Sequence, residues 1–468
     1  MKSDWKKFRF EDLLLEPVRN GIYKKKEFHG RGVKIVNMGE LFRYPRLTDV
    51  DMKRVELKEN EIQKMLLKTG DLLFARRSLT AEGAGKCSIV REVNEPTTFE
   101  SSIIRASPNP KLANSDFIYY LYSSPIGFHL LDTIRRQVAV AGITGGDLKN
   151  LELHMPPLTE QKAIAHILGS LDDKIELNQR MNETLEGMAK ALFKSWFIDF
   201  DPVIDNALEA GNSIPDELTK HAEIRRKALA DGTANREVAK QFPSTFQFTE
   251  GMGWIPNGWA VTTIGDIASV IKGKSYKSSE LKESNTALVT LKSFKRGGGY
   301  RKDGLKEYVG EFKPEQEVFS GDLVIAYTDI TQDADVIGKP AIVMANKKYD
   351  RLVISLDVAV VRPQSESLKY FLFGLTQSRH FQDYTSSFSM GTTVLHLSKE
   401  AVPSYIFTLP KEILLLEYQN FTKSIYAEIQ NRIDQETSLT KLRDTLLPKL
   451  ISGELKVPEA EKLVEEVL

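Results

Sequence analysis

Few residues of this chain combine the type and the spacing that catalysis needs. Lys272-Gly273-Lys274-Ser275 has the ending of a phosphate-binding loop, but position 268, where the leading glycine belongs, is Ala268. Gly83-Ala84-Gly85-Lys86 also fails, because Cys87 stands where the motif needs Ser or Thr. We interpret both segments as glycine turns.

Metal and methyl-transfer chemistry have no clear motif either. The seven histidines are scattered and form no metal-binding pattern with the single cysteine. Pro215-Asp216-Glu217 resembles a nuclease carboxylate pair, but the further carboxylate and lysine are missing, and a helix N-cap is the simpler interpretation. No Asn-Pro-Pro-aromatic motif of amino-methyltransferases occurs. The sequence therefore predicts no catalytic site, no metal site and no cofactor held by this chain.

Basic side chains mixed with aromatic residues and glycines are more informative. Such segments suit contacts to a phosphate backbone and to guanine edges, although runs of charge are more often solvated faces. The glycine-rich stretch 295–302 stands out, because glycines give it freedom to follow a backbone. The candidate DNA-binding residues are Lys24, Lys25, Lys26, Arg43, Arg46, Arg76, Arg77, Lys274, Lys277, Lys295, Arg296, Arg301 and Lys302.

The segments that must position these residues occur twice. Trp5 and Asp12 precede Trp259 and Asp266 by the same number of residues. The order of motifs then repeats: a GDL strand, a GK strand, an apolar strand, an aromatic helix and a proline before a long helix. The GDL strand is followed by Arg in the first copy and by Tyr, Thr and Asp in the second. The repeated order indicates an internal duplication. The different residues at the strand ends fit two readers of different sequences on one scaffold, and they also fit neutral drift of surface loops.

Two long amphipathic helices are predicted over residues 159–197 and 411–450. Their apolar residues fall mostly three and four apart, which is typical of a narrow coiled-coil seam. The first stripe also includes Met181 and Met188, and Asn178 and Asn182 lie beside it. We expect the seam to contain Leu171, Ile175, Leu185, Leu192, Ile425, Ile429, Leu439 and Leu446.

Bulk composition indicates an ordinary globular chain of 468 residues. Lys and Arg number 64, as do Asp and Glu, and this neutral balance argues against a purely electrostatic nucleic-acid binder without excluding local basic faces. Cys87 is the single cysteine, no apolar run reaches the length of a membrane span, and the first residues lack a signal-peptide core. We therefore expect a cytoplasmic protein with no membrane partner.

Over nearly its whole length the chain resembles the specificity subunits of type I restriction-modification systems. The resemblance rests on residues 160–203, from EQKAIAHILGSLDDKIELNQ to WFIDFDPV, on GWIPNGW before the second repeat, on both GDL strands and on LRDTLLPKLISGELKV at 442–457. The family implies an α+β fold: two similar mixed α/β target recognition domains joined by two long antiparallel helices in a pseudo-two-fold repeat.

The resemblance also implies the function and the partners. The family's subunit has no catalysis of its own, and each domain reads one half of a split site in double-stranded DNA. Two modification (methyltransferase) subunits would use S-adenosylmethionine to methylate adenine, and restriction (translocase and nuclease) subunits would use ATP and Mg²⁺. The implied segments are 1–157 and 258–410 for the recognition domains, 158–203 and 411–457 for the spacer helices, 204–257 for a partly helical linker, and 458–468 for a tail.

A second interpretation stays open from the residues alone. A pseudo-symmetric scaffold that recruits two copies of a partner, without binding DNA, would have the same repeat, and the neutral charge is compatible with it. Sequence-dependent and salt-dependent binding to duplex DNA separates the two interpretations.

Overall fold

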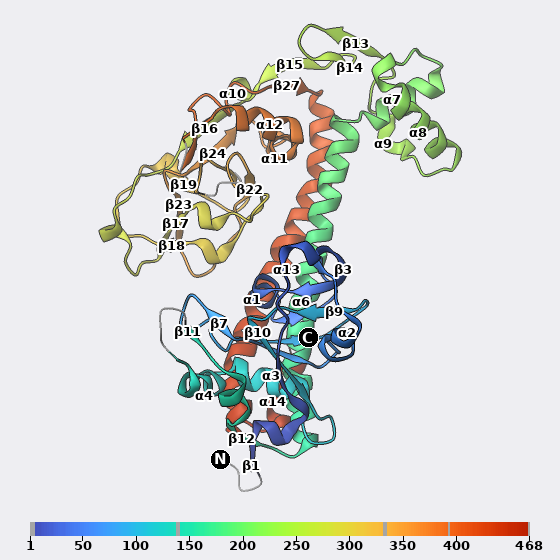
Figure 1. The fold of residues 1–468 in the computed structure, drawn as a ribbon. Helices are drawn as coiled ribbons and strands as arrows, with labels where there is room; N and C mark the ends of the chain where they lie inside the picture. Colours follow the sequence, from blue (N-terminus) through green and yellow to red (C-terminus); the bar gives the residue numbers. More distant parts are fainter. Residues whose placement is uncertain (1–4, 137–140, 331–334, 392–393, 467–468) are drawn as a thin grey trace. The chain divides into compact units, whose positions relative to one another are not determined.

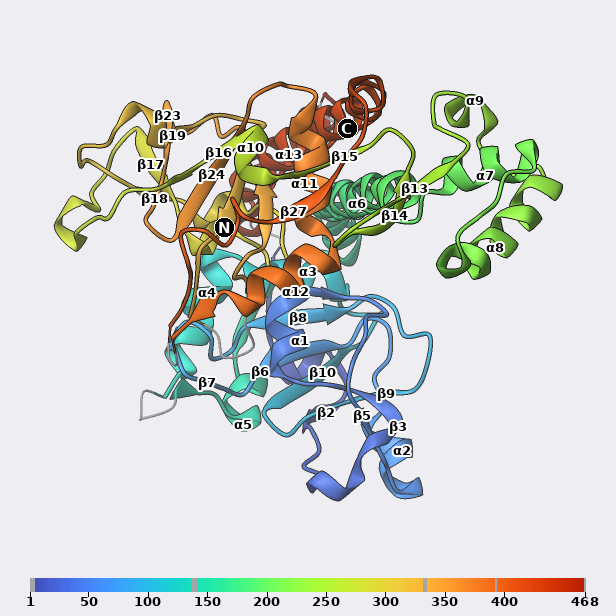
Figure 2. The ribbon, with the colours of Figure 1, turned by 90° about the horizontal axis from the view of Figure 1, so that it is seen from above.

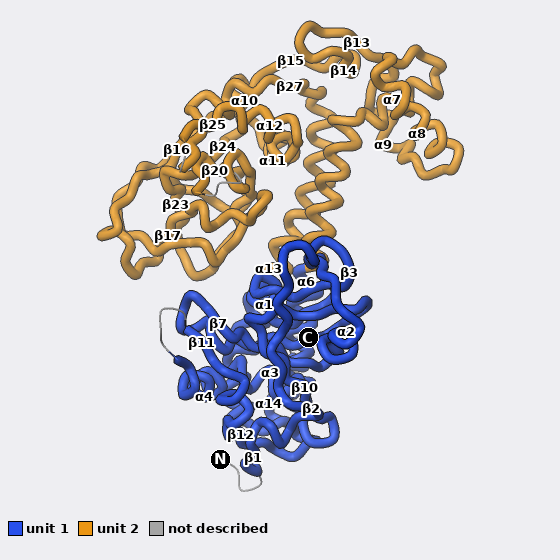
Figure 3. Tube along the Cα trace, in the orientation of Figure 1, with its two compact units in different colours: residues 1–179, 434–468 blue, residues 180–433 orange. Residues whose placement is uncertain are grey.

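The computed structural model describes residues 5–136, 141–330, 335–391 and 394–466, and its chain forms two compact units (Figures 1 and 3). Unit 1 comprises Met1–Gln179 and Asp434–Leu468, and unit 2 comprises Arg180–Ile433. Two helices, α6 (Leu158–Phe197) and α13 (Glu412–Ser452), contribute residues to both units. Each unit therefore contains one end of each long helix.

Unit 1 is built on a five-stranded sheet in the order β2-β10-β6-β8-β4, in which β4 joins β8 in parallel and the other neighbours are antiparallel. A three-stranded sheet, β5-β3-β9, and the pairs β1–β12 and β7–β11 complete it. It contains the strands β1 (Lys6–Arg9), β2 (Leu14–Asn20), β3 (His29–Val36), β4 (Arg46–Leu47), β5 (Arg54–Val55), β6 (Leu72–Ala75), β7 (Arg77–Ser78), β8 (Cys87–Val90), β9 (Thr97–Phe99), β10 (Ile103–Pro108), β11 (Ala141–Gly142) and β12 (Glu152–Met155). Besides the long helices it contains α1 (Met38–Arg43), α2 (Glu59–Met65), α3 (Ser115–Ser123), α4 (Pro125–Ile134), α5 (Gly145–Lys149) and α14 (Val457–Glu465).

The central strands of unit 1, β6, β8 and β10, are buried on both faces, which explains the continuous apolar run Leu72–Ala75 of β6. In β6, Leu72 and Phe74 join the hydrophobic cluster that includes the helices α3 and α6. Leu73 and Ala75 point to the opposite face and join a cluster with Val36 of β3. The alternation of side chains along a strand thus places two cores on one sheet.

Unit 2 repeats this arrangement. Its four-stranded sheet has the order β16-β24-β20-β22, and a second sheet has the order β18-β17-β23-β19. The strand that enters each domain pairs with the strand that precedes a long helix: β1 with β12, and β15 with β27. The unit contains the strands β13 (Phe246–Thr249), β14 (Gly253–Pro256), β15 (Ala260–Thr263), β16 (Ala268–Lys272), β17 (Thr286–Val289), β18 (Lys306–Glu307), β19 (Glu317–Val318), β20 (Leu323–Ala326), β21 (Thr328–Asp329), β22 (Pro340–Ile342), β23 (Arg351–Ile354), β24 (Val358–Pro363), β25 (Ser389–Met390), β26 (Leu395–Leu397) and β27 (Ile406–Leu409). It also contains the helices α7 (Asp201–Ala210), α8 (Thr219–Ala230), α9 (Arg236–Ala239), α10 (Ile264–Ile267), α11 (Leu368–Gln377) and α12 (Arg379–Ser387).

The two long helices lie side by side and antiparallel (Figures 1 and 2). In unit 1 the start of α6 packs with the end of α13, and in unit 2 the end of α6 packs with the start of α13. All eight predicted seam residues lie in these clusters or against them. Leu171, Ile175, Leu439 and Leu446 belong to the cluster of unit 1, Ile429 belongs to that of unit 2, and Leu185, Leu192 and Ile425 pack against the latter.

The predicted stripe was wrong at Met181 and Met188, which are 37% and 57% exposed. The buried positions between Ile175 and Leu185 are Asn178 and Asn182 instead. This seam keeps the spacing of three and four residues, but polar side chains occupy it, so a search for apolar residues chose the neighbouring methionines. Asn178 Nδ2 donates a hydrogen bond of 3.3 Å to Gln435 Oε1 of α13.

Residues 204–257, predicted to be a linker with one helix, contain parts or all of three α-helices and a β-hairpin, β13–β14. Val203, Ile204 and Ala207 of α7 are buried. Arg225 of α8 donates bonds of 2.8 and 2.6 Å to the carboxylate of Asp205, which is itself buried. A few apolar residues and a buried ion pair hold this segment together, and neither gives a strong local sequence signal.

We predict that Gly273→Ala destabilises unit 2. A Cβ at Gly273 would lie 2.2 Å from Ser355 O and 2.3 Å from Ile354 O, both backbone atoms that cannot move aside easily. We expect the free energy of unfolding to fall by about 1–3 kcal/mol, measured by urea denaturation with tryptophan fluorescence.

Gly187→Ala is the matched control. Gly187 lies within α6 with no atom near its missing Cβ, so alanine there should raise stability by about 0.5–1 kcal/mol. Equal effects of the two substitutions would contradict the close backbone approach at Gly273.

Candidate nucleic-acid interface

Basic residues lie in corresponding loops of the two units, after β2 and after β16. Gly21 and Gly273 have no room for a side chain, because a Cβ would lie 2.0 Å from Glu100 O and 2.2 Å from Ser355 O. The next residues, Ile22 and Lys274, each form a parallel bridge, with Glu100 and Ser355. The two loops therefore leave their sheets in the same way, and the basic residues follow.

The lysines of the first loop have different surroundings. The side chain of Lys24 is only 7% exposed and its Nζ lies 2.6 Å from Glu61 Oε2. Lys25 and Lys26 are exposed at the start of a short 3₁₀ helix, Lys26–Phe28. Of this run, Lys25 and Lys26 are therefore the lysines presented to solvent. In the second loop Lys277 is exposed and Lys274 is half-buried.

Arg43 and Arg46 are close in sequence but lie in different environments. Arg43 ends α1, is exposed and stacks over the ring of Tyr44 at 5.3 Å. Arg46 in β4 is 8% exposed, and its guanidinium bonds to Asp173 and lies 3.0 Å from Glu176, both on α6. Burial lowers the pKa of Arg46, but the bond to Asp173 and the nearby negative charges outweigh it, so this pKa lies above its ordinary value. The prediction that Arg46 binds DNA does not fit this placement, whereas Arg43 remains a surface cation.

The residues after the GDL strands differ between the units. Arg77 is exposed in β7, and Arg76 is half-buried with its Nη1 3.3 Å from Ser101 O. The corresponding strand of unit 2, β21, ends in Asp329, which is buried and accepts bonds from the amides of Val336 and Ile337 at 2.6 and 3.0 Å. Arg77 corresponds to Thr328, which is buried, so this pair of equivalent strands presents an exposed arginine in unit 1 and a buried threonine in unit 2.

The glycine-rich loop of unit 2 is more ordered than its composition predicts. Gly297, Gly298 and Gly299 all have positive φ, at 82°, 106° and 95°. Their amides donate to the carbonyls of Asp335, Lys295 and Pro340 at 3.0, 3.0 and 3.1 Å. Because these donors are already used, the loop offers a phosphate its side chains and not its backbone.

Arg296 is the most accessible guanidinium of this loop. Its side chain is 81% exposed, and the nearest carboxylate, Asp335, is 3.8 Å away. Arg301 is held by Asp303 in a paired contact of 3.0 and 2.5 Å, and this bond raises the pKa of Arg301. Lys295 is exposed and Lys302 is half-buried. Tyr300 is a core residue, only 9% exposed.

Lys272, at the end of β16, was not among the candidate DNA-binding residues. Its Nζ sits 4.7 Å from the centre of the Tyr327 ring. Burial lowers the pKa of Lys272, and the charge of Lys399 lowers it further. The failed phosphate-loop motif drew attention to Lys272, but no sequence signal placed Lys399 near it.

One group among the described residues brings together side chains that are able to bind a metal. Asp199, Asp201 and His221 have ligand atoms within 4.8 Å of one another. The carboxylates already have cationic partners, since Lys194 pairs with Asp199 and Arg225 lies 3.6 Å from Asp201. We interpret these ion pairs as contacts that stabilise the turn from α6 to α7, where Phe200 has a positive φ of 56°.

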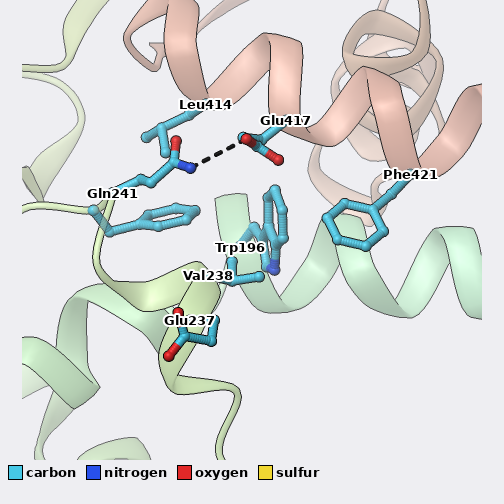
Figure 4. Close-up of a pocket in the computed structure, with 8 residues that line it drawn as sticks. Trp196, Glu237, Val238, Gln241, Leu414, Glu417 and Phe421 are labelled. Atoms are coloured by element: carbon cyan, nitrogen blue, oxygen red, sulfur yellow. Dashed lines mark hydrogen bonds between the residues drawn. The ribbon is translucent and has the colours of Figure 1, made fainter.

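Unit 2 also contains a pocket of about 320 Å³ between α6, α9 and α13 (Figure 4). Trp196, Phe242 and Leu414 give it apolar walls. Gln241 Nε2 donates to Glu417 Oε1 at 3.1 Å across its edge, and Glu237 pairs with Lys240. These polar groups hold one another and form no acid–base or nucleophile pair.

Comparisons with known proteins agree with the repeat. The family model described as "Type I restriction modification DNA specificity domain" matches residues 2–187 and 256–445. The HindI specificity subunit of Haemophilus influenzae is 23% identical over 97% of this chain and 100% of its own length. The MjaIX specificity subunit of Methanocaldococcus jannaschii is 22% identical over 93% of this chain and 90% of its own. A crystal structure of an S subunit from M. genitalium has 14% identity, a TM-score of 0.49 and 96% coverage of both chains.

No helix in the described part of the chain combines the length and the apolar character needed to cross a bilayer.

We predict that Arg296→Ala weakens binding to duplex DNA. The exposed guanidinium has only a distant carboxylate partner, so a phosphate contact is available to it. Losing one such contact should reduce the slope of log affinity against log salt by about 1, measured by fluorescence anisotropy across a salt series.

Arg226→Ala is the control for this substitution. Arg226 is exposed on α8, outside both recognition domains, and its loss changes the net charge equally. Its salt slope should match that of the unmodified chain. A fall of the same size in both variants would show that Arg296 acts only through net charge.

Proposed function

The chain belongs to the type I restriction modification DNA specificity family, and from this membership we propose that it reads a bipartite DNA site with its two domains. The observation that carries the proposal is the double match: the family model covers both halves, and the order β2-β10-β6-β8 in one half corresponds to β16-β24-β20-β22 in the other. The chain is the specificity subunit of a type I complex and directs adenine methylation or cleavage by partner subunits. The alternative, a scaffold that does not bind DNA, is not favoured, because its main support was the neutral charge.

The chemistry is divided among subunits. This chain supplies recognition and no catalysis. We infer that two modification subunits carry S-adenosylmethionine and that restriction subunits carry ATP and Mg²⁺. The HindI and MjaIX relatives are named as specificity subunits of type I restriction enzymes, which supports assembly with such partners. A cytoplasmic location fits a complex that acts on chromosomal DNA.

Recognition requires two kinds of contact. Exposed lysines and arginines, such as Lys25, Arg77 and Arg296, are suited to phosphates and fix the position of each domain on the duplex. Polar side chains at the loop tips then read base edges in the major groove. The divergence between exposed Arg77 and its counterpart Thr328, which is buried, supports two domains that read different half-sites.

The long helices are proposed to set the distance between half-sites. The helices α6 and α13 have 40 and 41 residues and each contributes to both units. At about 1.5 Å per residue such a helix is about 60 Å long, which exceeds one turn of DNA at about 34–36 Å. An unread spacer between two read half-sites follows from this length.

We predict that deleting one heptad from each long helix shortens the DNA spacer. The deletions belong at facing positions beside the Asn178–Gln435 contact, so that the seam stays in register. Seven residues correspond to about 10 Å of helix, or about 3 base pairs. Sequencing of methylated adenines in a host carrying the complex should show a shorter spacer and unchanged half-site bases.

The same experiment tests the proposed function itself. The unmodified complex should methylate one bipartite sequence, and an insertion of one heptad in each helix should lengthen the spacer. If the half-site bases change and the spacer does not, the helices do not set the distance. If no sequence-dependent methylation occurs, the chain is not a specificity subunit.

A further inference from the structure

A buried carboxylate in unit 1 connects the first recognition domain to both long helices. Asp172 of α6 is 6% exposed. Its Oδ2 accepts a bond of 2.7 Å from the hydroxyl of Tyr120 on α3. Its Oδ1 accepts a bond of 2.7 Å from Arg443 Nη1 on α13. One side chain thus joins three helices.

Arg46 adds a second connection between the same domain and α6. It lies in β4, at the edge of the five-stranded sheet, and contacts Asp173, the neighbour of Asp172, and Glu176, one turn further along the helix. Together, these residues are called the docking network here. The docking network consists of Arg46, Tyr120, Asp172, Asp173, Glu176 and Arg443.

The bonds of the docking network depend on the distance and angle between donor and acceptor. A buried ion is strongly disfavoured unless its partners meet it at short distance and in good geometry. The bond to Asp172 and the charge of that carboxylate hold the pKa of Arg443 above its usual value, although burial acts in the opposite direction. Burial raises the pKa of Tyr120, and the charge of Asp172 raises it further, so the hydroxyl keeps the proton that it donates. A rotation of the domain on the helices would break these bonds.

In unit 2, different side chains occupy the positions that correspond to Tyr120 and Asp172. Ser124 and Ser378 cap α4 and α12 at equivalent positions, and the common offset places Gly374 where unit 1 has Tyr120, and Tyr426 where it has Asp172. Gly374 faces the ring of Phe193, since a Cβ there would lie 2.3 Å from it. Tyr426 stacks on Tyr370 with ring centres 5.0 Å apart and planes 6° from parallel.

The two recognition domains contact the long helices through different side chains at these equivalent positions. Phe373 meets Tyr426 edge to face at 5.5 Å, which completes an aromatic contact in unit 2. Aromatic packing tolerates small shifts better than a buried carboxylate with two fixed donors. Because the repeat keeps the backbone arrangement, the difference lies in the side chains. At these equivalent positions unit 1 has a tyrosine and a buried carboxylate and unit 2 has a glycine and an aromatic ring, although the second domain also bonds to α13, for example from the amide of Ala345 to Gln430 Oε1 at 2.9 Å.

We propose that the docking network fixes the orientation of the first recognition domain on the helix pair and so restricts the DNA spacer that the complex accepts. This inference rests on the proposed function. The residues of the network are positioning residues, because their charged groups and hydroxyl are bonded to one another between the first domain and the two helices. Their loss changes the spacers that are accepted and leaves the bases of both half-sites as they were.

The test uses the complete methylation complex with Asp172→Asn, Arg443→Met and Tyr120→Phe. Duplexes with the half-sites of the unmodified complex and spacers one or two base pairs shorter or longer compete for methylation. In the network variants, the rate on non-native spacers relative to the native spacer should rise about tenfold, which corresponds to about 1.4 kcal/mol. Tyr120→Phe keeps the ring and the Asp172–Arg443 pair, so it carries the test if the charge variants fail to fold.

Glu428→Gln is the matched control. It removes one carboxylate from α13, but the partner of Glu428 is Arg432 on the same helix, 2.7 Å away. Its spacer preference should equal that of the unmodified complex. A uniform loss of rate on every spacer in the network variants would overturn the proposal, since it would show only lowered stability. An unmodified complex that methylates without sequence preference would instead refute the proposed function.

Discussion

The seam between α6 and α13 is the contact on which the remaining structure depends. A helix of 40 residues with a narrow apolar stripe needs a partner to cover that stripe in water. Here the recognition domains complete the cover. The cluster of unit 1 contains Leu171 and Leu446 together with Phe74 of the sheet, and the cluster of unit 2 contains Phe193 and Tyr418 together with Phe371. Neither domain therefore has a core that is independent of the helices.

Much of this frame was predictable from the sequence because it depends on local periodicity. The long helices were predicted to within two residues, since their stripes are regular and prolines precede both. The equivalent strands followed from repeated GDL and GK motifs, which the structure places at matching positions of two sheets. Segment 204–257 was not predictable to the same degree. Its short helices are held by tertiary contacts such as that between Arg225 and Asp205, which periodicity does not show.

The candidate site was less predictable, because the environment of a cation depends on partners far along the chain. Arg43 and Arg46 occur in one basic segment, but Asp173 and Glu176 of α6 bury only the second. Lys24 and Lys25 are adjacent in the sequence, but Glu61 forms an ion pair with Lys24, while Lys25 is exposed. Glycines predicted a flexible loop at 295–302, whereas long-range bonds to Asp335 and Pro340 fix it. Composition identified the loops that carry basic residues, and tertiary structure decided which of these residues face solvent.

The same partition of cations explains how a chain with zero formal net charge serves a DNA-binding role. Arg225 forms an ion pair with Asp205, and Arg351 forms one with Glu317. The positive charge of each arginine is therefore neutralised by a carboxylate of the same chain. What attracts a polyanion is the local surplus of accessible cations, because fields from exposed charges fade within about 10 Å in physiological salt. Arg296, 81% exposed with a carboxylate only at 3.8 Å, is such a surplus charge. A neutral total therefore limits non-specific attraction to any polyanion and leaves the attraction local to loops with accessible cations such as Arg296. Selective DNA reading requires that balance, since a uniformly basic surface binds all sequences alike.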